Sequence, residues 1–348
     1  MKVRFGYALS SEEHRTADLV RNAAMAEESG FEFALISDHY HPWVDAQGHS
    51  PFVWTVLGAI ARETQTLEVG TGVTCPMIRI HPAIIAQAAA TTADLFEGRF
   101  FLGVGTGENL NEHILGDHWP PYADRSEMLI ESMEIMRDLW KGKLYSHQGE
   151  HYVVENARIY TLAEQPPRIM VAAQGPESAA LAGRHGDGLI ITSPDTEVIG
   201  GFRDSGGDDK PIYGQVTCCW ASSAEKGKRT LHEIWPNAGV PGELSQELPL
   251  PQHFEQASSL VTAEMLAEKT PIGPDVEPYV DAVRELIEAG VGNVYIHQVG
   301  PDQEGFFRFF RDELQPELAK LGRSSGARRA AGNGTKERGK SAKSKKAK

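Results

Sequence analysis

The chain has 348 residues, of which 41% are hydrophobic and 24% charged, a globular composition long enough for one α/β barrel with insertions. No apolar run reaches the roughly 18–20 residues of a membrane span, and the first residues lack the apolar core of a signal peptide. Three cysteines, two of them adjacent, give no disulfide framework, so we expect a reduced, cytoplasmic protein without membrane contact.

The net charge of −14 is unevenly distributed. Residues 323–348 carry +9, whereas residues 1–322 carry −23. The strong negative charge of residues 1–322 argues against a nucleic-acid-binding surface on the folded part of the chain. The basic segment is rich in Gly, Ala, Ser and Lys and has no hydrophobic periodicity, which predicts a disordered tail without a specific nucleic-acid partner. We therefore expect a single domain over residues 1–322.

Short apolar runs alternate with amphipathic stretches along this domain. The apolar runs predict eight strands, at residues 3–8, 33–36, 67–73, 100–104, 169–173, 188–191, 212–219 and 293–297. The amphipathic stretches predict helices at residues 16–29, 52–62, 82–96, 127–140, 177–184, 224–235, 276–289 and 304–320. A hairpin is expected at residues 144–154 and an insertion, irregular over most of its length, at about residues 236–270.

Eight strands alternating with helices predict a (β/α)₈ TIM barrel with insertions. An open, doubly wound sheet is the alternative. Such a sheet would ordinarily use fewer strands and would place a glycine motif after its first strand, where this chain has none.

Two of the predicted strands run into residues of catalytic type. A glycine-rich segment, residues 103–107, lets a ligand approach the backbone closely and is followed by Glu108. Another strand end supplies Asp38, His39 and Trp43. Because the C-terminal ends of barrel strands meet at one face, we expect one active site there.

His39 and Glu108 are candidates for proton transfer, since an imidazole titrates near neutrality and a carboxyl in a dry pocket can hold a proton. A structural alternative for His39 is a bond to a backbone carbonyl. Asp38, His39 and His41 also suit zinc or iron, but no further His/Asp cluster is apparent, and we expect no metal. The glycine spacing disfavours a nicotinamide site and leaves open a phosphate or an isoalloxazine-type ring.

Several segments taken together resemble the bacterial luciferase-like superfamily. More narrowly, they resemble its deazaflavin branch, the coenzyme F420-dependent glucose-6-phosphate dehydrogenases. The similarity spans residues 3 to about 322, and the matching segments are residues 37–43, 70–73, 103–112, 172–176, 182–188 and 192–193.

The resemblance implies a role for each matching residue. His39 would be the base on the hydroxyl being oxidised, Glu108 would protonate the ring nitrogen, and Trp43 would stack beside the reacting centre. Asp38 would orient the deazaflavin ring, and Gly72–Val73 would form a non-proline cis peptide behind it. Further cofactor contacts would come from Cys75, Thr106, Gly107, Asn111, Gln174 and Gly175.

The predicted substrate end departs from the family pattern. Sugar-phosphate members place a lysine three residues after the threonine that corresponds to Thr192, and this chain has Asp195 there. A second basic position aligns with Gln256, so that only a third, near Lys269, remains. An aspartate where a phosphate should bind is unfavourable because like charges repel.

The sequence therefore predicts a homodimeric F420-dependent oxidoreductase that moves a hydride between the deazaflavin and a hydroxyl or carbonyl substrate. An unphosphorylated sugar or alcohol is the expected small-molecule substrate, with glucose 6-phosphate as the alternative. Two further alternatives are an FMN-dependent monooxygenase and a non-catalytic flavin-binding barrel.

Overall fold

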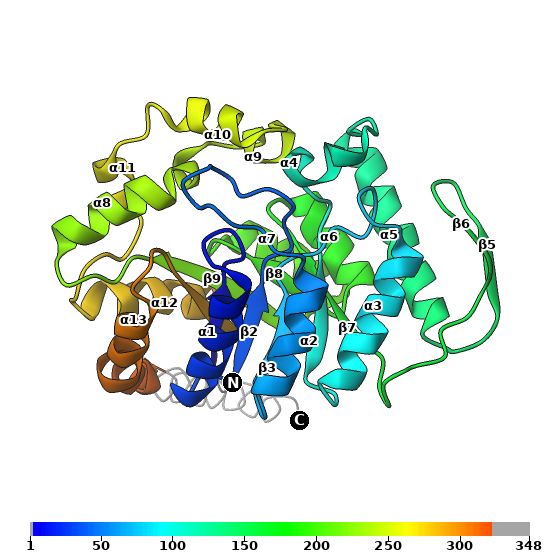
Figure 1. Ribbon diagram of the computed structural model, residues 1–348, viewed down its shortest axis with the longest axis horizontal. Coiled ribbons are helices and arrows are strands. Elements are labelled where there is room, and N and C mark those ends of the chain that lie inside the picture. The colour runs from blue at the N-terminus through cyan, green and yellow to red at the C-terminus, as the bar shows by residue number, and fades with distance from the viewer. Residues whose placement is uncertain (1–2, 322–348) are drawn as a thin grey trace, which may run out of the picture.

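Eight parallel strands close into a barrel in the computed structural model, which describes residues 3–321 (Figure 1). The order around the barrel is β1-β10-β9-β8-β7-β4-β3-β2. The strands are β1 (Arg4–Leu9), β2 (Phe33–Ile36), β3 (Glu68–Thr71), β4 (Phe100–Val104), β7 (Arg168–Ala172), β8 (Gly188–Ile191), β9 (Ile212–Cys218) and β10 (Asn293–Gln298). The predicted TIM barrel is confirmed.

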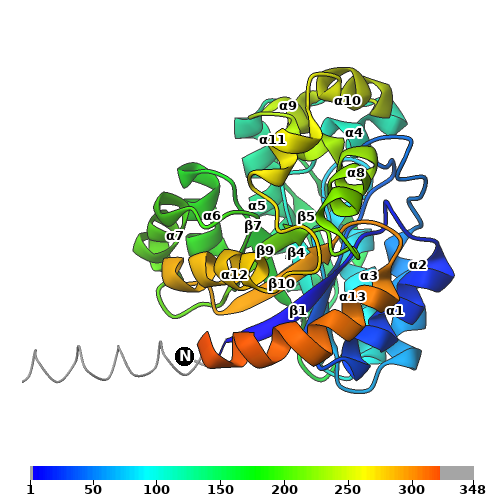
Figure 2. The same cartoon turned by 90° about the vertical axis from the view of Figure 1, so that its left-hand side faces the viewer.

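Helices pack around the outside of the barrel, as the two views show (Figures 1 and 2). They are α1 (Thr16–Glu28), α2 (Val53–Glu63), α3 (Pro82–Leu95), α5 (Tyr122–Leu139), α6 (Pro176–His185), α7 (Thr196–Phe202), α8 (Ala224–Ile234), α12 (Glu277–Ala289) and α13 (Gln303–Phe309). A two-stranded hairpin, β5 (Tyr145–Gln148) and β6 (Val153–Ala157), projects from one side (Figure 1). No helix within residues 3–321 is long and apolar enough to cross a membrane.

Two segments differ from the expectation from sequence. Helix α7 had no predicted counterpart because polar residues and glycines surround its short apolar stripe, of which Val198, Ile199 and Phe202 are buried. The insertion folds into short helices: η3 (Pro236–Gly239), α9 (Leu244–Glu247), α10 (Pro251–Ser258) and α11 (Ala263–Ala267). Each has too few turns to show helical periodicity. The expected tail at 323–348 lies outside the described residues.

The insertion covers the C-terminal end of the barrel, since α9 and α10 lie above the strands in Figure 1. Phe254 of α10 is fully buried and packs with Val44 and Leu110, which belong to segments that follow β2 and β4. The insertion therefore closes over the strand ends where we expected the site.

A layer of large side chains fills the barrel below this end: Phe33, Leu35, Phe101, Met170, Ile190, Tyr213 and Tyr295. Glycine makes room for one of them, because a Cβ on Gly70 would lie 2.1 Å from the ring of Phe101. The interior is thus a packed core, and space for a ligand begins only above this layer.

The circular strand order decides which strand ends face one another. In a closed ring of eight, strands four places apart are opposite, so β2 faces β8, β4 faces β10 and β3 faces β9. Residues that follow β2 therefore lie across the barrel from residues of β8, and residues that follow β4 lie across from residues of β10.

Candidate active site

A cavity of about 430 Å³ lies over the C-terminal strand ends. Its floor is the apolar layer, represented by Leu35, Ile190 and Tyr295. The sequence-predicted residues that line it are His39, Trp43, Gly72, Val73, Glu108, Gln174 and Thr192. The insertion contributes Ser245, Gln246 and Phe254 to its wall. This volume lies within the usual range for small-molecule sites.

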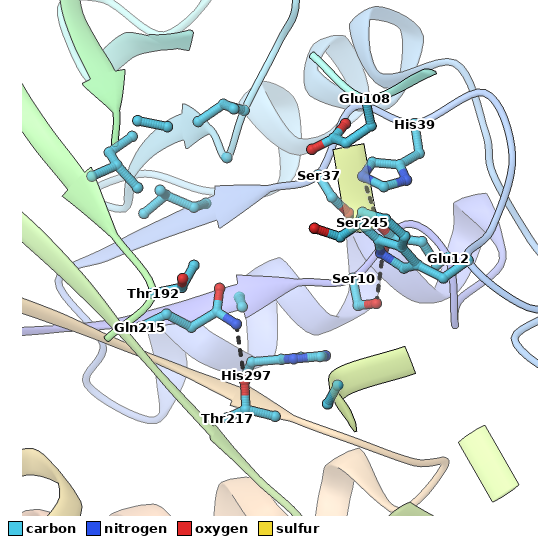
Figure 3. A pocket seen from close by; sticks show the side chains of 18 of the residues that line it. Ser10, Glu12, Ser37, His39, Glu108, Thr192, Gln215, Thr217, Ser245 and His297 are labelled. Carbon is cyan, nitrogen blue, oxygen red and sulfur yellow. Dashed lines mark hydrogen bonds and ion pairs between the residues drawn. The ribbon is translucent and has the colours of Figure 1, made fainter. Parts of the chain in front are cut away.

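Glu12, which follows β1, faces His39 inside the cavity and was not singled out from the sequence. Its Oε1 lies 3.4 Å from His39 Nε2, and its Oε2 accepts hydrogen bonds from the hydroxyls of Ser37 (2.7 Å) and Ser10 (3.0 Å) (Figure 3). A signal was present, because two consecutive acidic residues, 12 and 13, come a few residues after the predicted strand at 3–8. The predicted barrel places this strand beside β2, but the sequence could not show which side chains after the two strands come into contact.

The surroundings of Glu12 keep its carboxylate charged. Burial by itself raises the pKa of this fully buried group, but the facing His39 and the Ser37 and Ser10 hydroxyls hold the pKa below its usual value. A charged, hydrogen-bonded carboxylate beside an imidazole stabilises the protonated ring.

His39 is fixed on both ring nitrogens and on one face. Its Nδ1 lies 3.2 Å from the carbonyl oxygen of His41, and its ring makes an edge contact with Trp43 at 4.9 Å between centroids. Trp43 in turn packs against Phe254 of the insertion at 5.1 Å. Since a carbonyl and a carboxylate both accept hydrogen bonds, only the imidazolium satisfies both neighbours. The site is therefore suited to the arrival of a proton at Nε2.

Asn111 connects the His39 segment to Glu108. Its Oδ1 accepts hydrogen bonds from the backbone N–H groups of Tyr40 (2.8 Å) and His41 (3.2 Å), and its Nδ2 donates to Glu108 Oε2 at 3.3 Å. The side chain of Asn111 is buried and does not line the cavity. The structure thus gives Asn111 a role in positioning the two candidate catalytic residues.

Asp38 lies behind the cavity wall in a buried ionic cluster. Its carboxylate accepts from Thr74 Oγ1 (2.8 Å) and pairs with Arg79 (2.9 Å), which also pairs with Glu112 (3.4 Å). Burial raises the pKa of Glu112 to about 7, against the opposing effect of Arg79. The cluster joins the segments that follow β2, β3 and β4.

The backbone after β3 forms the wall next to this cluster. Gly72–Val73 is a cis peptide bond, as the resemblance predicted, and both residues line the cavity. Gly107 has φ +78°, and a Cβ there would lie 2.7 Å from the sulfur of buried Cys75. Neither Cys75 nor Gly107 lines the cavity, and Thr106 is also outside its lining.

These residues fit a planar, mostly apolar ring. Val73, Leu35, Ala172 and Ile190 provide apolar surface without a charged group, whereas the hydrogen-bonding residues gather on the rim. Gln174 also lines the cavity and accepts a hydrogen bond from Gln246 of the insertion at 3.3 Å. Gly175 lies outside the lining and immediately precedes helix α6.

Of the three predicted substrate residues, one lines the cavity and two lie outside its lining. Thr192 lines the cavity, whereas Asp195 caps α7, where its carboxylate accepts from the backbone N–H groups of Glu197 (2.8 Å) and Val198 (3.1 Å). Lys269 is exposed in the turn after α11, outside the cavity lining. Among the described residues, no lysine or arginine lines the cavity.

The structure also bears on the metal alternative. Residues 3–321 contain no group of three or more His, Cys, Asp or Glu side chains arranged to hold a metal ion. His41 Nδ1 donates to the carbonyl oxygen of Leu110 at 2.8 Å.

Comparisons with known proteins agree with this geometry. The sequence model for luciferase-like monooxygenases matches residues 2–293. The chain is 34% identical over 335 residues to an F420-dependent glucose-6-phosphate dehydrogenase of Mycolicibacterium gilvum (strain PYR-GCK), which covers 92% of this chain and 99% of that one. It is 35% identical over 320 residues to an F420-dependent hydroxymycolic acid dehydrogenase of Mycobacterium tuberculosis (strain ATCC 25618 / H37Rv), covering 90% and 88%.

Among solved structures, the chain resembles an F420-dependent secondary alcohol dehydrogenase in complex with an F420-acetone adduct. The TM-score is 0.84 at 27% identity, and the match covers 91% of this chain and 99% of that one.

Proposed function

The chain belongs to the luciferase-like monooxygenase family, and from that premise we propose that it is an F420-dependent dehydrogenase acting on a hydroxyl group. The relatives with this cofactor act on a sugar phosphate, a hydroxymycolic acid and a secondary alcohol, so the shared feature is a CH–OH group. The observation that carries the proposal is the pairing of buried Glu12 with His39 in a cavity that Glu108 also lines.

Coenzyme F420 would supply the acceptor for the hydride that leaves the carbinol carbon of the substrate. Gly72, Val73 and the apolar floor would hold its ring, and Gln174 would contact it from the rim. Asp38 would act through the Thr74–Arg79 cluster that supports this wall.

His39 takes the hydroxyl proton of the substrate at Nε2. The nearby Glu12 carboxylate stabilises the imidazolium that forms, and Trp43 keeps the ring in place. Glu108, oriented by Asn111, holds a second proton at its carboxyl group on the same side of the cavity. Oxidation of the alcohol releases one proton, which His39 would accept, and reduction of the deazaflavin takes up one proton besides the hydride, which Glu108 would supply.

We propose further that the substrate is a neutral alcohol or sugar. The cavity contains the carboxyl groups of Glu12 and Glu108 and no cationic side chain among its described lining residues. A bound phosphate needs charge-assisted contacts of about 1.5–3 kcal/mol each. Two of the three basic positions of the sugar-phosphate members are occupied here by Asp195 and Gln256, so the two missing contacts cost at least about 3 kcal/mol, a hundredfold in affinity.

An absorbance titration tests the cofactor, and steady-state kinetics tests the substrate. We expect the protein to bind F420 and not FMN, and binding of FMN alone would overturn the dehydrogenase. With F420 bound, we expect glucose and secondary alcohols to be oxidised in preference to glucose 6-phosphate. A clear preference for the phosphorylated sugar contradicts the neutral-substrate proposal while leaving the cofactor proposal intact.

Two finer properties complete the proposal. We propose a cytoplasmic location, because Cys75, Cys218 and Cys219 are all free and buried. We propose a homodimer on the resemblance alone, and sedimentation equilibrium tests it directly.

A further inference from the structure

Three polar side chains of β9 and β10 line the part of the cavity opposite Glu108 and the Gly72–Val73 wall and have no part in the mechanism above. They are Gln215, Thr217 and His297, here called the far wall. The strand order places β9 opposite the Gly72–Val73 wall and β10 opposite β4, which Glu108 follows. Figure 3 shows the far wall on the side of the cavity away from Glu108 and His39.

The register of the barrel brings the far wall together. Thr217 and His297 are paired residues of neighbouring strands, and Gln215 lies two residues before Thr217 on the same face. Gln215 Nε2 donates to Thr217 Oγ1 at 3.0 Å. The amide oxygen of Gln215 and its second N–H are left for another partner.

His297 is held in one orientation by a buried carboxylate. Its Nε2 lies 2.8 Å from Glu13 Oε1, and Glu13 Oε2 accepts from the backbone N–H of Gly300 at 2.7 Å. Trp235 packs edge-on against the imidazole at 4.5 Å. The side chains of His297 and Glu13 are 4% and 2% exposed, so water cannot take the place of this pairing.

The Glu13 contact also decides which nitrogen of His297 is left for a ligand. A carboxylate only accepts hydrogen bonds, so Nε2 carries a hydrogen that it donates to Glu13, and Nδ1 is the ring nitrogen that remains. Nδ1 has no hydrogen-bond partner among residues 3–321. The far wall therefore offers an imidazole nitrogen, an amide and a hydroxyl.

We propose that the far wall is a binding subsite for a second hydroxyl group of the substrate, which makes the substrate a neutral polyol. A hydroxyl both donates and accepts, so it matches Nδ1 of His297 and the Gln215 amide together. An anion would need lysine or arginine donors, which the wall lacks. The proposal rests on the proposed function, since the reacting CH–OH lies at His39 while the second hydroxyl lies at the far wall.

Glu13 is a positioning residue in this proposal because it acts through His297. Glu13→Gln retains an oxygen that accepts from Nε2–H, whereas Glu13→Ala releases the ring. We therefore expect Glu13→Ala to raise KM for polyols at least tenfold with a smaller change in kcat, and Glu13→Gln to restore most of that loss. An equal effect of both variants on KM contradicts the assigned positioning.

The test compares polyols with monohydric secondary alcohols of the same chain length in the F420-loaded protein. Thr217→Val keeps the shape of the side chain, and His297→Phe keeps a ring but removes its nitrogens. We expect either change to lower the ratio of kcat/KM for the polyol to that for the monohydric alcohol by ten- to a hundredfold. Thr91→Val, on the exposed face of α3 away from the cavity, should leave this ratio unchanged.

A second measurement separates this inference from the proposed function. Direct binding of sorbitol to the F420-loaded protein, followed by ligand-observed NMR, should weaken at least tenfold in Thr217→Val and His297→Phe. Unchanged sorbitol binding overturns the subsite, and so does a tenfold loss of F420 affinity in these variants, which would assign the far wall to the cofactor. Failure of every alcohol to reduce F420 overturns the dehydrogenase, whatever sorbitol does.

Discussion

Asn111 offers the sharpest test of how the active site is held together, because one side chain serves two loops. Its amide oxygen accepts from two backbone N–H groups of the His39 segment, and its amide nitrogen donates to Glu108. Two substitutions separate these functions. Asn111→Ala removes both, whereas Asn111→Asp keeps the acceptor and replaces the donor by an oxygen.

The cost of Asn111→Ala follows from the donors it leaves without a partner. Each unsatisfied buried donor costs about 1–3 kcal/mol, and here there are two. Because both hydrogen bonds are only partly buried and water replaces part of each, we expect a loss of about 2 kcal/mol in the free energy of unfolding. Catalysis should fall as well, since the His39 segment and Glu108 lose their common anchor.

Asn111→Asp should instead leave the fold intact and disturb the charge balance. It places a carboxylate oxygen 3.3 Å from Glu108 Oε2 in place of the amide donor. Two charges at that distance repel by about 5 kcal/mol at an effective dielectric constant of about 20, so the pair retains one proton. A carboxyl whose folded pKa is raised contributes stability below its unfolded pKa, and this contribution is lost as pH rises through the folded value.

Urea unfolding between pH 5 and pH 8, together with stopped-flow reduction of F420, measures both effects. We expect Asn111→Asp to become progressively less stable than the wild type as pH rises from 5 towards 8, while Asn111→Ala is less stable by a similar amount at every pH. If Asn111→Asp unfolds with the wild-type pH dependence, the Asn111–Glu108 contact does not exist in solution and the positioning role is wrong.

Three further predictions follow from particular contacts. His39→Ala and Glu108→Gln should each slow F420 reduction by about 10²–10⁴-fold with little change in F420 affinity, and a wild-type rate in either variant refutes the proton-transfer roles. Glu27 accepts hydrogen bonds from backbone N–H groups of the loop before β3. Burial raises the pKa of Glu27, but these hydrogen bonds outweigh that effect and hold the pKa below its usual value of 4.5. The stabilisation by the Glu27 carboxylate is therefore present above pH 4.5 and is lost as the pH falls. Glu27→Gln should therefore cost about 1 kcal/mol at pH 7 in urea unfolding, whereas exposed Glu28→Gln should cost none; equal stability of the two variants contradicts this anchor. Asp195→Ala should cost about 1 kcal/mol through loss of the α7 cap without changing the preference between glucose and glucose 6-phosphate, and a changed preference in steady-state assays would return Asp195 to the substrate site.

The barrel could be predicted from the sequence because its signals are local. Buried parallel strands such as residues 100–104 and 188–191 are short apolar runs, and these two were placed with the observed bounds. The helices of the insertion could not be placed in the same way. Helix α10 has eight residues, and its buried Phe254 gains its position from Trp43, which lies far away in the sequence.

Some residues of the candidate site could likewise be predicted from local sequence, and others could not. His39, Trp43 and Glu108 are recognisable from sequence because each closely follows a strand, and the C-terminal ends of barrel strands share one face. Asp195 has the same kind of position, yet its carboxylate caps a helix, a role set by the path of the following backbone.

Only the closed barrel brought Glu12 to His39 and Glu13 to His297. Glu12 precedes His39 by 27 residues and Glu13 precedes His297 by 284, a separation that no local pattern spans. β1 lies between β2 and β10, so consecutive acids at its end meet one histidine on each side. The sequence determined which chemical groups reach the cavity, and closure of the strands determined which of them act on one another, because partner choice depends on strand neighbours that are distant along the chain.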